Sequence, residues 1–469
     1  MNFLDRLAGY FYAASLVTLP WAGLGVLRLA TGRDWGGGLQ PSWLFMALAV
    51  AVAAVRWLVR GRPRTAGCRP GAVTGAGMIW VVAVVVSVLG LTLAPASVPW
   101  QEALARFLKQ VVQLAVMLVF TVWVAWWTRD PRRWVWTARL IVAGALLQAG
   151  YGILQLAGYA GHLAWFGGLD RIFTSNPSIL SGSRELYIDN LMLPVARLRG
   201  TVCEPLYLGN FLLLAIPLVV LTRWRRWWTV ASGSLLAVLL VLTWSRGAWL
   251  AGAGGLSAFV ILWVACGPKS DEAGFRNFRG WAGAMTGVAL SVVLVLILVG
   301  DPGLLWRRLW QSFSVRDWSN LTRFYSMQAA WRAFLLSPVV GIGWGQFGWH
   351  FPALVEPLGL QSQFSWPVVN NFYLEVMCET GLLGLAGLVM FLVRAGRAFL
   401  ARAVATCRRS DRDRVHAAAV AAAFTGVWLQ MLTFSQYNLP HIWVALGLLI
   451  AYGREPGVIR EKDWEADRS

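Results

Sequence analysis

The stretch "VVNNFYLEVMCETGLLGL", residues 368–385, has the composition of a membrane helix and yet carries two glutamates. Glu375 and Glu379 are four residues apart, so on a helix they lie on one face. A carboxyl group inside a membrane span is costly unless it faces the interior of a helix bundle or a water-filled cavity. We therefore expect 368–393 to be one helix of a polytopic membrane protein, with this face turned inward and with Glu379 as the structural member of the pair.

The rest of the 469-residue chain has the same apolar character, since 58% of its residues are apolar and 13% are charged, whereas soluble domains carry roughly 25% charge. Stretches of roughly 20 apolar residues cross a bilayer. About twelve such stretches follow one another and leave no room for a separate soluble domain, so 1–469 is predicted to be a single all-α polytopic membrane domain. The predicted spans are 7–29, 41–59, 72–94, 104–127, 135–157, 203–222, 227–244, 247–266, 281–300, 368–393, 415–435 and 438–453.

Basic residues predict the orientation, because short loops rich in Lys and Arg stay cytoplasmic. The basic segments are 56–69, 129–139, 223–226, 269–279, 394–414 and the residues after Gly453. With about twelve spans they all fall on one side, so both termini are expected to be cytoplasmic. The net charge of +19 is then explained by an inner face close to anionic lipid, and no nucleic-acid partner is expected.

Two outer connections, 158–202 and 301–367, are much longer than the others and rich in aromatic residues. Ordered loops of such length are usually functional. The second one predicts an amphipathic helix that begins after an N-cap at Ser319, ends before Pro338 and lies along the membrane interface. The glycine-rich stretch "GIGWGQFG" (341–348) has no preceding strand, so it is predicted to be a tight turn and not a dinucleotide-binding loop.

Three polar residues near the outer face are candidates for a site. Arg246 lies in "LTWSRGAWLAG" (242–252), where two spans meet with almost no connecting loop, so its guanidinium is expected at the outer membrane boundary. "RLRGTVCEPLYLGNF" (197–211) brings Arg199 and Glu204 close in sequence. Arginine suits phosphate recognition, and Arg199 is a candidate phosphate ligand. Glu204 is either the ion-pair partner of Arg199 or a group that acts on an acceptor.

Three stretches occur in the order typical of one family: "SRGAWLAG" (245–252), "LTRFYSMQAAWRAFLLSPVVGIGWGQF" (321–347) and "NNFYLEVMCETGLLGL" (370–385). Over 196–395 the chain resembles the O-antigen ligase and polymerase superfamily. The resemblance implies a glycosyltransferase with a GT-C-like helical fold in the bacterial inner membrane. It also implies an extracytoplasmic active site that uses a glycan linked to undecaprenyl pyrophosphate.

The resemblance further implies roles for single residues. Arg246 and Arg323 match the family arginines that hold the lipid pyrophosphate. The family's histidine, proposed as the base in an H-N-x-Y-L segment, is replaced here by Asn370, followed by Asn371. An amide cannot accept a proton near neutral pH, so these two asparagines are expected to line the acceptor entrance and orient the acceptor. The remaining candidate bases are Glu204 as first choice, Glu356, Glu375 and His441, and the departing pyrophosphate is a further proton acceptor.

Two reactions remain open within the family. A polymerase transfers the glycan to the next lipid-linked repeat unit, and a ligase transfers it to lipid A core; the absent histidine and the carboxylate of Glu204 favour the polymerase. A lipid-linked sugar flippase is the rival class, disfavoured because the arginines gather at one face and no internal repeat is evident. No metal or cofactor is expected, since no Asp-rich outer motif occurs. The expected partners are the undecaprenyl-pyrophosphate-linked oligosaccharide, the acceptor glycan, membrane lipid and, as a candidate, a chain-length regulator.

Overall fold

The computed structural model describes residues 3–21, 23, 25–32, 40–60, 72–159, 161–163, 165–173, 187–188, 191–192, 196–266, 302–310, 318–355, 367–407 and 410–454. The predicted span at 281–300 and the candidate base Glu356 lie outside these residues.

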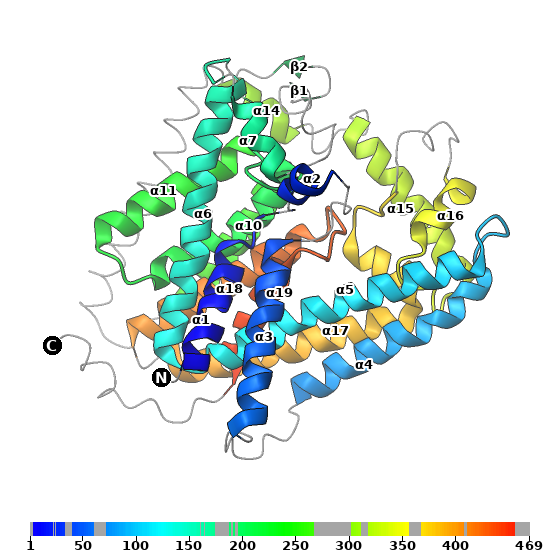
Figure 1. The fold of residues 1–469 in the computed structure, drawn as a ribbon, viewed down its shortest axis with the longest axis horizontal. Coiled ribbons are helices and arrows are strands. Elements are labelled where there is room, and N and C mark those ends of the chain that lie inside the picture. The colour runs from blue at the N-terminus through cyan, green and yellow to red at the C-terminus, as the bar shows by residue number, and fades with distance from the viewer. Residues whose placement is uncertain are drawn as a thin grey trace.

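The described part of the chain is helical, as predicted, apart from one short strand pair (Figure 1). In its first half lie α1 (Phe3–Val17), α2 (Gly25–Thr31), α3 (Pro41–Arg60), α4 (Ala72–Val86) continued by the 3-10 helix η1 (Ser87–Leu93), α5 (Trp100–Trp127), α6 (Pro131–Tyr159), α7 (Phe166–Phe173), α10 (Pro205–Leu218) continued by η2 (Val219–Leu221), and α11 (Arg226–Leu242). In its second half lie α12 (Arg246–Ala265), α14 (Pro302–Trp310), α15 (Trp318–Leu336), α16 (Phe347–Leu354), α17 (Phe372–Cys407), α18 (Asp411–Gln430) and α19 (Pro440–Gly453). The strands β1 (Tyr187–Ile188) and β2 (Leu191–Met192) pair antiparallel.

Among the described residues, six helical segments are long and apolar enough to cross a membrane: Pro41–Val59, Ala72–Leu93, Trp100–Trp127, Pro131–Tyr159, Arg246–Ala265 and Phe372–Cys407. Shorter apolar helices occupy Pro205–Leu221, Arg226–Leu242 and Pro440–Gly453. Each of these nine segments overlaps a predicted span. The prediction of one continuous span over 7–29 is wrong, because α1 ends at Val17 and α2 begins at Gly25. Pro20 explains the break, since proline and the residue before it disfavour a continuing helix.

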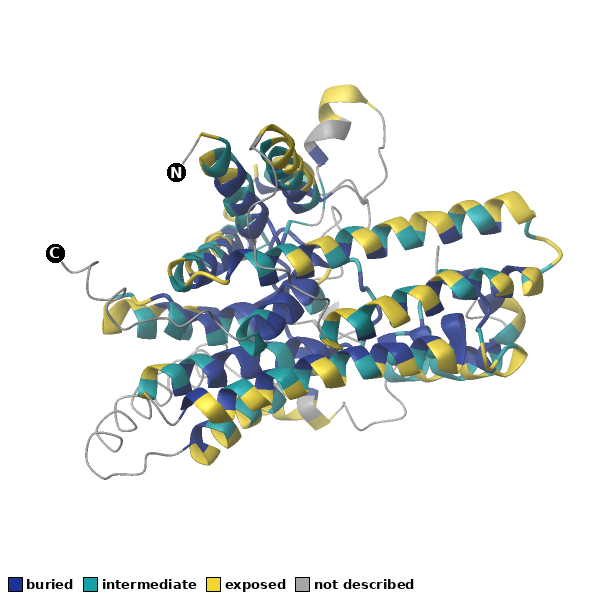
Figure 2. Cartoon of the chain, turned by 90° about the horizontal axis from the view of Figure 1, so that it is seen from below, coloured by how far each residue is buried: buried dark blue, intermediate teal, exposed yellow. Residues whose placement is uncertain are grey.

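The bundle core is built from helices that are distant in sequence. Helix α12 packs against α18, α4 against α17 and α5 against α19. Trp80 on α4 stacks on Trp443 of α19 with ring centroids 5.9 Å apart. Figure 2 shows the buried residues on the inward sides of these helices and exposed residues on their outer sides. Exposed aliphatic side chains such as Val82, Val112 and Leu382 are the surface that a helix presents to lipid.

Helix α17 is interrupted at Gly381, which has φ of 65° and ψ of −167°. The connection after α15 enters this interruption and exchanges backbone hydrogen bonds with both sides of it. Amides of Ile342 and Gly343 donate to the carbonyls of Cys378 and Glu379 (3.1 and 2.9 Å), and amides of Leu382 and Leu383 donate to the carbonyls of Pro338 and Val339 (2.8 and 3.2 Å). The backbone groups that the break releases are thereby satisfied, as burial demands.

The predicted turn at 341–348 is confirmed by this arrangement. Gly341, Gly343 and Gly345 all have positive φ, and the segment follows helix α15 instead of a strand. A Cβ on Gly341 would lie 2.2 Å from the carbonyl carbon of Glu379, so glycine is required for the approach to α17. The turn therefore fixes α15 and α16 against α17.

Candidate functional site

Four helices begin around the connection 431–439 between α18 and α19. The amide of Phe372 on α17 donates to the carbonyl of Met431 (2.9 Å). The backbone of Gly247 on α12 lies close to the side chain of Thr433, and the ring of Tyr207 on α10 lies 5.8 Å from the ring of Phe434. The N-termini of α10, α12, α17 and α19 therefore lie near one another. Because the free amides and dipole of a helix make its N-terminus partly positive, this convergence favours a bound anion.

Arg246 is the first residue of α12 and lies at this convergence. The preceding Trp244 has φ of 54°, which turns the chain from α11 into α12, and Ser245 caps the new helix by accepting a hydrogen bond from the amide of Ala248 (3.4 Å). Arg246 is 6% exposed. Its Nη2 donates to Oδ1 of Asn320 on α15 at 3.1 Å.

Arg323 lies one helical turn after Asn320 on α15, so the two side chains share a face of that helix. Arg323 is half-buried. The hydrogen bond from Arg246 to Asn320 thus brings α12 to the part of α15 that carries Arg323. Tertiary contact has joined two segments that are 74 residues apart, and Asn320 is a site residue that sequence reasoning missed because a lone asparagine in an outer loop carries no distinguishing signal.

Helix α15 occupies the segment predicted to be an amphipathic helix. Phe324, Trp331 and Leu335 are exposed, whereas Ala330 and Phe334 are buried against the protein. The helix begins at Trp318, so the predicted N-cap Ser319 lies inside it, within the uncertainty of helix ends.

Glu204 is exposed and occupies the N-cap position of α10, with φ of −143° and ψ of 147°. Its side chain does not cap the helix. The neighbouring Cys203 has its pKa raised to about 11, first by burial and then by the charge of Glu204. The Cys203 thiol is therefore neutral near pH 7.

Arg199 is placed differently from the prediction. It is fully buried, pairs with the carboxylate of Asp170 on α7 and donates to the carbonyls of Gly200 and Val202 at 3.2 and 3.1 Å. Tyr151 holds the other carboxylate oxygen of Asp170 at 2.5 Å. A guanidinium enclosed in this way cannot reach a lipid pyrophosphate, so its contacts indicate a structural role.

Asn370 and Asn371 precede α17. Oδ1 of Asn371 accepts the amide of Leu374 at 3.1 Å, which is an N-cap interaction. Asn370 has φ of 59°, a conformation that asparagine tolerates better than most residues, and its Nδ2 donates to the carbonyl of Val368 at 3.4 Å. Both side chains are half-buried, and Asn371 also caps the N-terminus of α17.

The two glutamates of α17 have different surroundings. Glu379 accepts hydrogen bonds from the amides of Gly345 (2.7 Å) and Phe347 (3.0 Å), so its predicted structural role is confirmed: it holds the glycine turn. The carboxylate of Glu375 lies beside Ser435 and the backbone of Val369, and its Oε2 is buried with no hydrogen-bond partner among the described residues.

Arg106 on α5 is a second residue that sequence reasoning missed. Its charge interacts with both Glu375 and Glu379, and its Nε donates to the carbonyl of Gly345 at 2.7 Å. The sequence did contain a signal for Arg106. It is an ionisable residue inside the predicted span 104–127, and a charged side chain in a membrane span requires a partner.

His441 is buried, and its Nε2 lies 2.8 Å from Oδ1 of Asn210. Asn210 also bonds Gln430 at 3.0 Å. His441 is thus part of a polar network inside the bundle through Nε2, whereas its Nδ1 is buried with no hydrogen-bond partner among the described residues.

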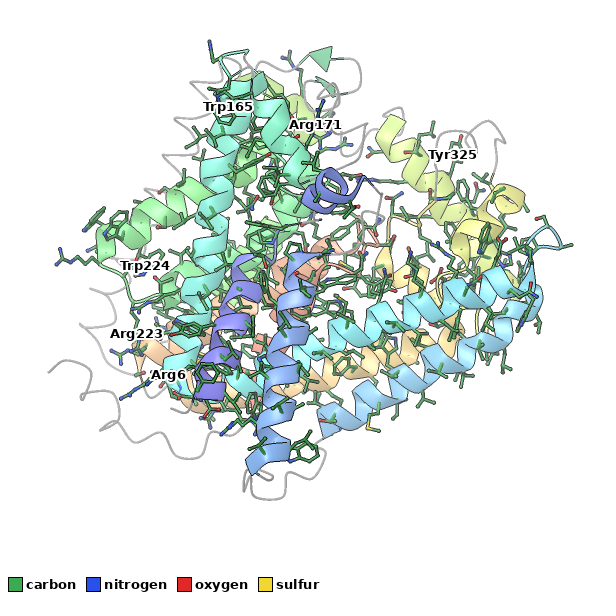
Figure 3. The ribbon with its side chains drawn as sticks, viewed as in Figure 1. Arg6, Trp165, Arg171, Arg223, Trp224 and Tyr325 are labelled. Carbon is green, nitrogen blue, oxygen red and sulfur yellow. The ribbon has the colours of Figure 1, made fainter. Side chains whose placement is uncertain are left out.

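The site lies away from the basic segments. Figure 3 shows Arg171 on α7 and Tyr325 on α15 on the side of this convergence, and Arg6 and Arg223 on the opposite side. Arg139 on α6 donates to the carbonyl of Thr222 at 2.7 Å, which joins two of the basic segments at that opposite end. Arg246 and these two basic segments therefore lie at different ends of the described bundle.

The fold and site define a helical protein with apolar helices of membrane-spanning length, in which Arg246 lies where the N-termini of four helices meet. Residues 231–389 match the family model described as O-antigen ligase. The match supports the O-antigen ligase and polymerase superfamily and confirms the resemblance read from the three motifs. It covers α11 to the first half of α17 and so includes Arg246, Asn320, Arg323, Asn370 and Glu375, whereas Arg199 and Glu204 lie before it. No curated protein matches the chain.

Proposed function

We propose that the chain is a polysaccharide polymerase of the inner membrane. It transfers a glycan from undecaprenyl pyrophosphate to a hydroxyl group of a lipid-linked repeat unit on the extracytoplasmic face. The acceptor oxygen bonds to the anomeric carbon, the bond from that carbon to the phosphate oxygen breaks, and its electron pair leaves with undecaprenyl pyrophosphate. The hydroxyl proton passes to a carboxylate or to the departing pyrophosphate.

The observation that carries this proposal is the hydrogen bond from Arg246 to Asn320, one turn from Arg323. It links an arginine at a helix N-terminus to the polar face of α15 at the point where three further helices begin. Negative charge grows on the phosphate oxygen as the glycosidic bond opens, and preorganised guanidinium groups and helix N-termini stabilise that charge. Arginine also matches phosphate oxygens in bidentate geometry.

Glu204 is the first candidate for the base, because it is exposed at the N-terminus of α10 and beside this convergence. Glu375 is the second, with its unsatisfied Oε2 and with Arg106 to balance its charge. Asn370 and Asn371 would orient the acceptor at the entrance to α17, without accepting a proton.

The test is turnover by purified protein given an undecaprenyl-pyrophosphate-linked oligosaccharide, with long lipid-linked chains resolved on a gel. Loss of one donor at a developing oxyanion lowers the rate by about 100- to 1000-fold, so Arg246→Ala and Arg323→Ala should each lower polymer formation by about that factor. Arg171→Ala is the matched control, because Arg171 is an exposed arginine on the same side and should keep the wild-type rate.

Near-wild-type turnover by both Arg246→Ala and Arg323→Ala, in protein that is inserted and folded, would overturn this function. Translocation of the donor without a new glycosidic bond would point to the flippase class instead.

A ligase that transfers the glycan to lipid A core is the second candidate, favoured by the match of 231–389 to the O-antigen ligase description. The two reactions differ in product. Incubation with donor alone gives long lipid-linked chains for a polymerase and no product for a ligase, whereas a ligase gives capped core when lipid A core is added.

A further inference from the structure

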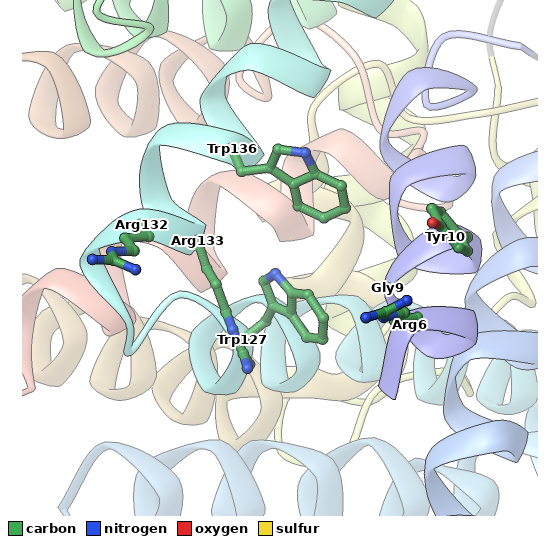
Figure 4. Close-up of a pocket in the computed structure, with 7 residues that line it drawn as sticks. All are labelled: Arg6, Gly9, Tyr10, Trp127, Arg132, Arg133 and Trp136. Atoms are coloured by element: carbon green, nitrogen blue, oxygen red, sulfur yellow. The ribbon is translucent and has the colours of Figure 1, made fainter. Parts of the chain in front are cut away.

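A cavity of about 500 Å³ opens between α1, α5 and α6, on the side away from the proposed active site. Its lining residues are Arg6, Gly9, Tyr10, Trp127, Arg132, Arg133 and Trp136. Figure 4 shows the arginines and the aromatic rings arranged around one space, with α1 on one side and the start of α6 on the other. Nothing in the proposed glycosyl transfer uses these residues.

Packed aromatic rings form the floor of the cavity. Trp127 and Trp136 have ring centroids 6.3 Å apart, and Tyr12 lies behind them, 5.0 Å from Trp127. A Cβ on Gly9 would lie 3.5 Å from the Trp127 ring, so α1 approaches this ring closely. The floor is therefore a fixed, apolar surface.

The indole of Trp127 is part of this packed floor. Trp127 is 7% exposed, and its Nε1 is buried with no hydrogen-bond partner among the described residues. An unpaired indole N–H is costly when buried, but this nitrogen is enclosed beneath the floor and offers no contact to a ligand in the cavity.

Arginines form the rim. The Arg133 guanidinium lies 4.3 Å above the centre of the Trp127 ring, and its Nε is 3.7 Å from Asp130. Arg6 and Arg132 are exposed, and their side chains make no ion pair with any described residue. Three positive charges thus face one carboxylate, which leaves net positive charge at the rim.

We propose that this cavity binds the phosphate headgroup of an anionic membrane lipid. The arginines would hold the phosphate oxygens, and the aromatic floor would take the glycerol backbone and the first carbons of the acyl chains. A basic, aromatic-lined pocket between membrane helices is suited to such headgroups. Tyr10, which is 68% exposed, extends the aromatic surface outward along α1, and inorganic phosphate or pyrophosphate has no apolar part to cover such a surface.

The experiment is native mass spectrometry of the full chain in detergent, with phosphatidylglycerol, phosphatidylcholine or inorganic pyrophosphate added in turn. The wild type should bind phosphatidylglycerol at least about tenfold more tightly than phosphatidylcholine. Each basic residue near a membrane surface strengthens binding to anionic lipid by about fivefold, so the double variant Arg6→Gln, Arg132→Gln should lose about 25-fold in affinity for phosphatidylglycerol and little for phosphatidylcholine.

Arg129→Gln is the matched control, because Arg129 is an exposed arginine of the same connection that does not line the cavity. It should keep wild-type binding. Equal affinity for the two lipids, an equal loss in Arg129→Gln, or unchanged binding in the double variant would overturn the proposal. Tight binding of pyrophosphate that displaces the lipid would also overturn it, in favour of a soluble phosphate ligand. The proposed polymerase reaction is independent of each outcome.

Discussion

The two long connections, 158–202 and 301–367, look alike in sequence, since both are aromatic-rich and both contribute arginine-containing segments. In the structure their polar residues make different contacts. The first ends in a buried ion pair, in which Arg199 is 0% exposed and Asp170 on α7 holds its guanidinium. The second reaches across the bundle, where Asn320 accepts from Arg246 and the glycine turn enters the break in α17.

An arginine in one of these long connections is therefore not by itself a phosphate ligand. Removal of either partner from a buried pair leaves an uncompensated charge, so the pair around Arg199 stabilises the fold. Arg246 lies at the N-terminus of α12 and donates to the neutral side-chain amide of Asn320. Because this partner carries no negative charge, the position suits an additional anion. The first connection should therefore respond to mutation in stability, and the second in catalysis.

The largest effect is expected at Asp170. Asp170→Ala would leave Arg199 charged and unpaired in the interior, which costs about 3–5 kcal/mol, and thermal unfolding in detergent would measure the loss. The double variant Asp170→Ala, Arg199→Met should recover much of the stability because no charge stays buried. Unfolding of Asp170→Ala at the wild-type temperature would contradict the structural reading of the first connection.

A smaller effect on stability is expected in the second connection at low pH. Burial lowers the pKa of His350 on α16 to about 4, compared with about 6.5 in an unfolded chain. His350 therefore becomes protonated near pH 6.5 in the unfolded chain but only near pH 4 in the folded protein. Its contribution to the free energy of unfolding is complete above pH 6.5 and decreases as the pH is lowered from 6.5 to 4. The loss at pH 5 is about 2 kcal/mol.

Unfolding curves at pH 7.5 and pH 5 measure this loss, and His350→Gln should reduce the difference between them. If the variant keeps the whole wild-type pH dependence, His350 is not its source.

A catalytic effect is expected from Asn320→Ala. Loss of a hydrogen bond to a charged group costs about 1.5 kcal/mol, which corresponds to about tenfold in rate. Because Asn320 positions Arg246 and does not hold the acceptor, kcat should fall while KM for the acceptor changes little. Gln328→Ala, which removes a half-buried amide from the same helix, is the matched control and should leave kcat unchanged; equal losses in both variants would refute the positioning role.

No effect is expected from a metal chelator. If guanidinium groups and helix N-termini stabilise the leaving pyrophosphate, turnover in EDTA should stay within about twofold of the untreated rate. Loss of activity that Mg²⁺ restores would show that the second connection needs a cation in addition to its arginines.

Local pattern was sufficient for much of the fold and for part of the site. Apolar segment length predicted most of the helices, because a span must satisfy its own backbone hydrogen bonds and present apolar side chains to lipid. The separation of Arg246 from the basic segments followed from the distribution of positive charge. The turn at 341–348 was also readable, since its glycines lie within one short stretch, whereas the partners of Glu379 are more than thirty residues away in the chain.

Contacts between segments that are distant in the chain could not be predicted from the sequence pattern. Asp170 and Asn320 became important because folding placed them against Arg199 and Arg246, and neither residue type is unusual in a loop. The interruption of α17 at Gly381 likewise depends on a partner segment that supplies backbone donors and acceptors, which a helical pattern does not reveal.

The sequence by itself indicated a helical membrane protein that resembles the O-antigen ligase and polymerase superfamily, with its candidate arginines in segments separate from the basic connections. Hydrophobic length and charge asymmetry are properties of the chain, so they can be read directly. Only the tertiary structure decided which arginine is enclosed in an ion pair and which one lies at the meeting point of helix N-termini. Burial and electrostatic environment arise from contacts between segments far apart in the chain, and those contacts exist only in the folded protein.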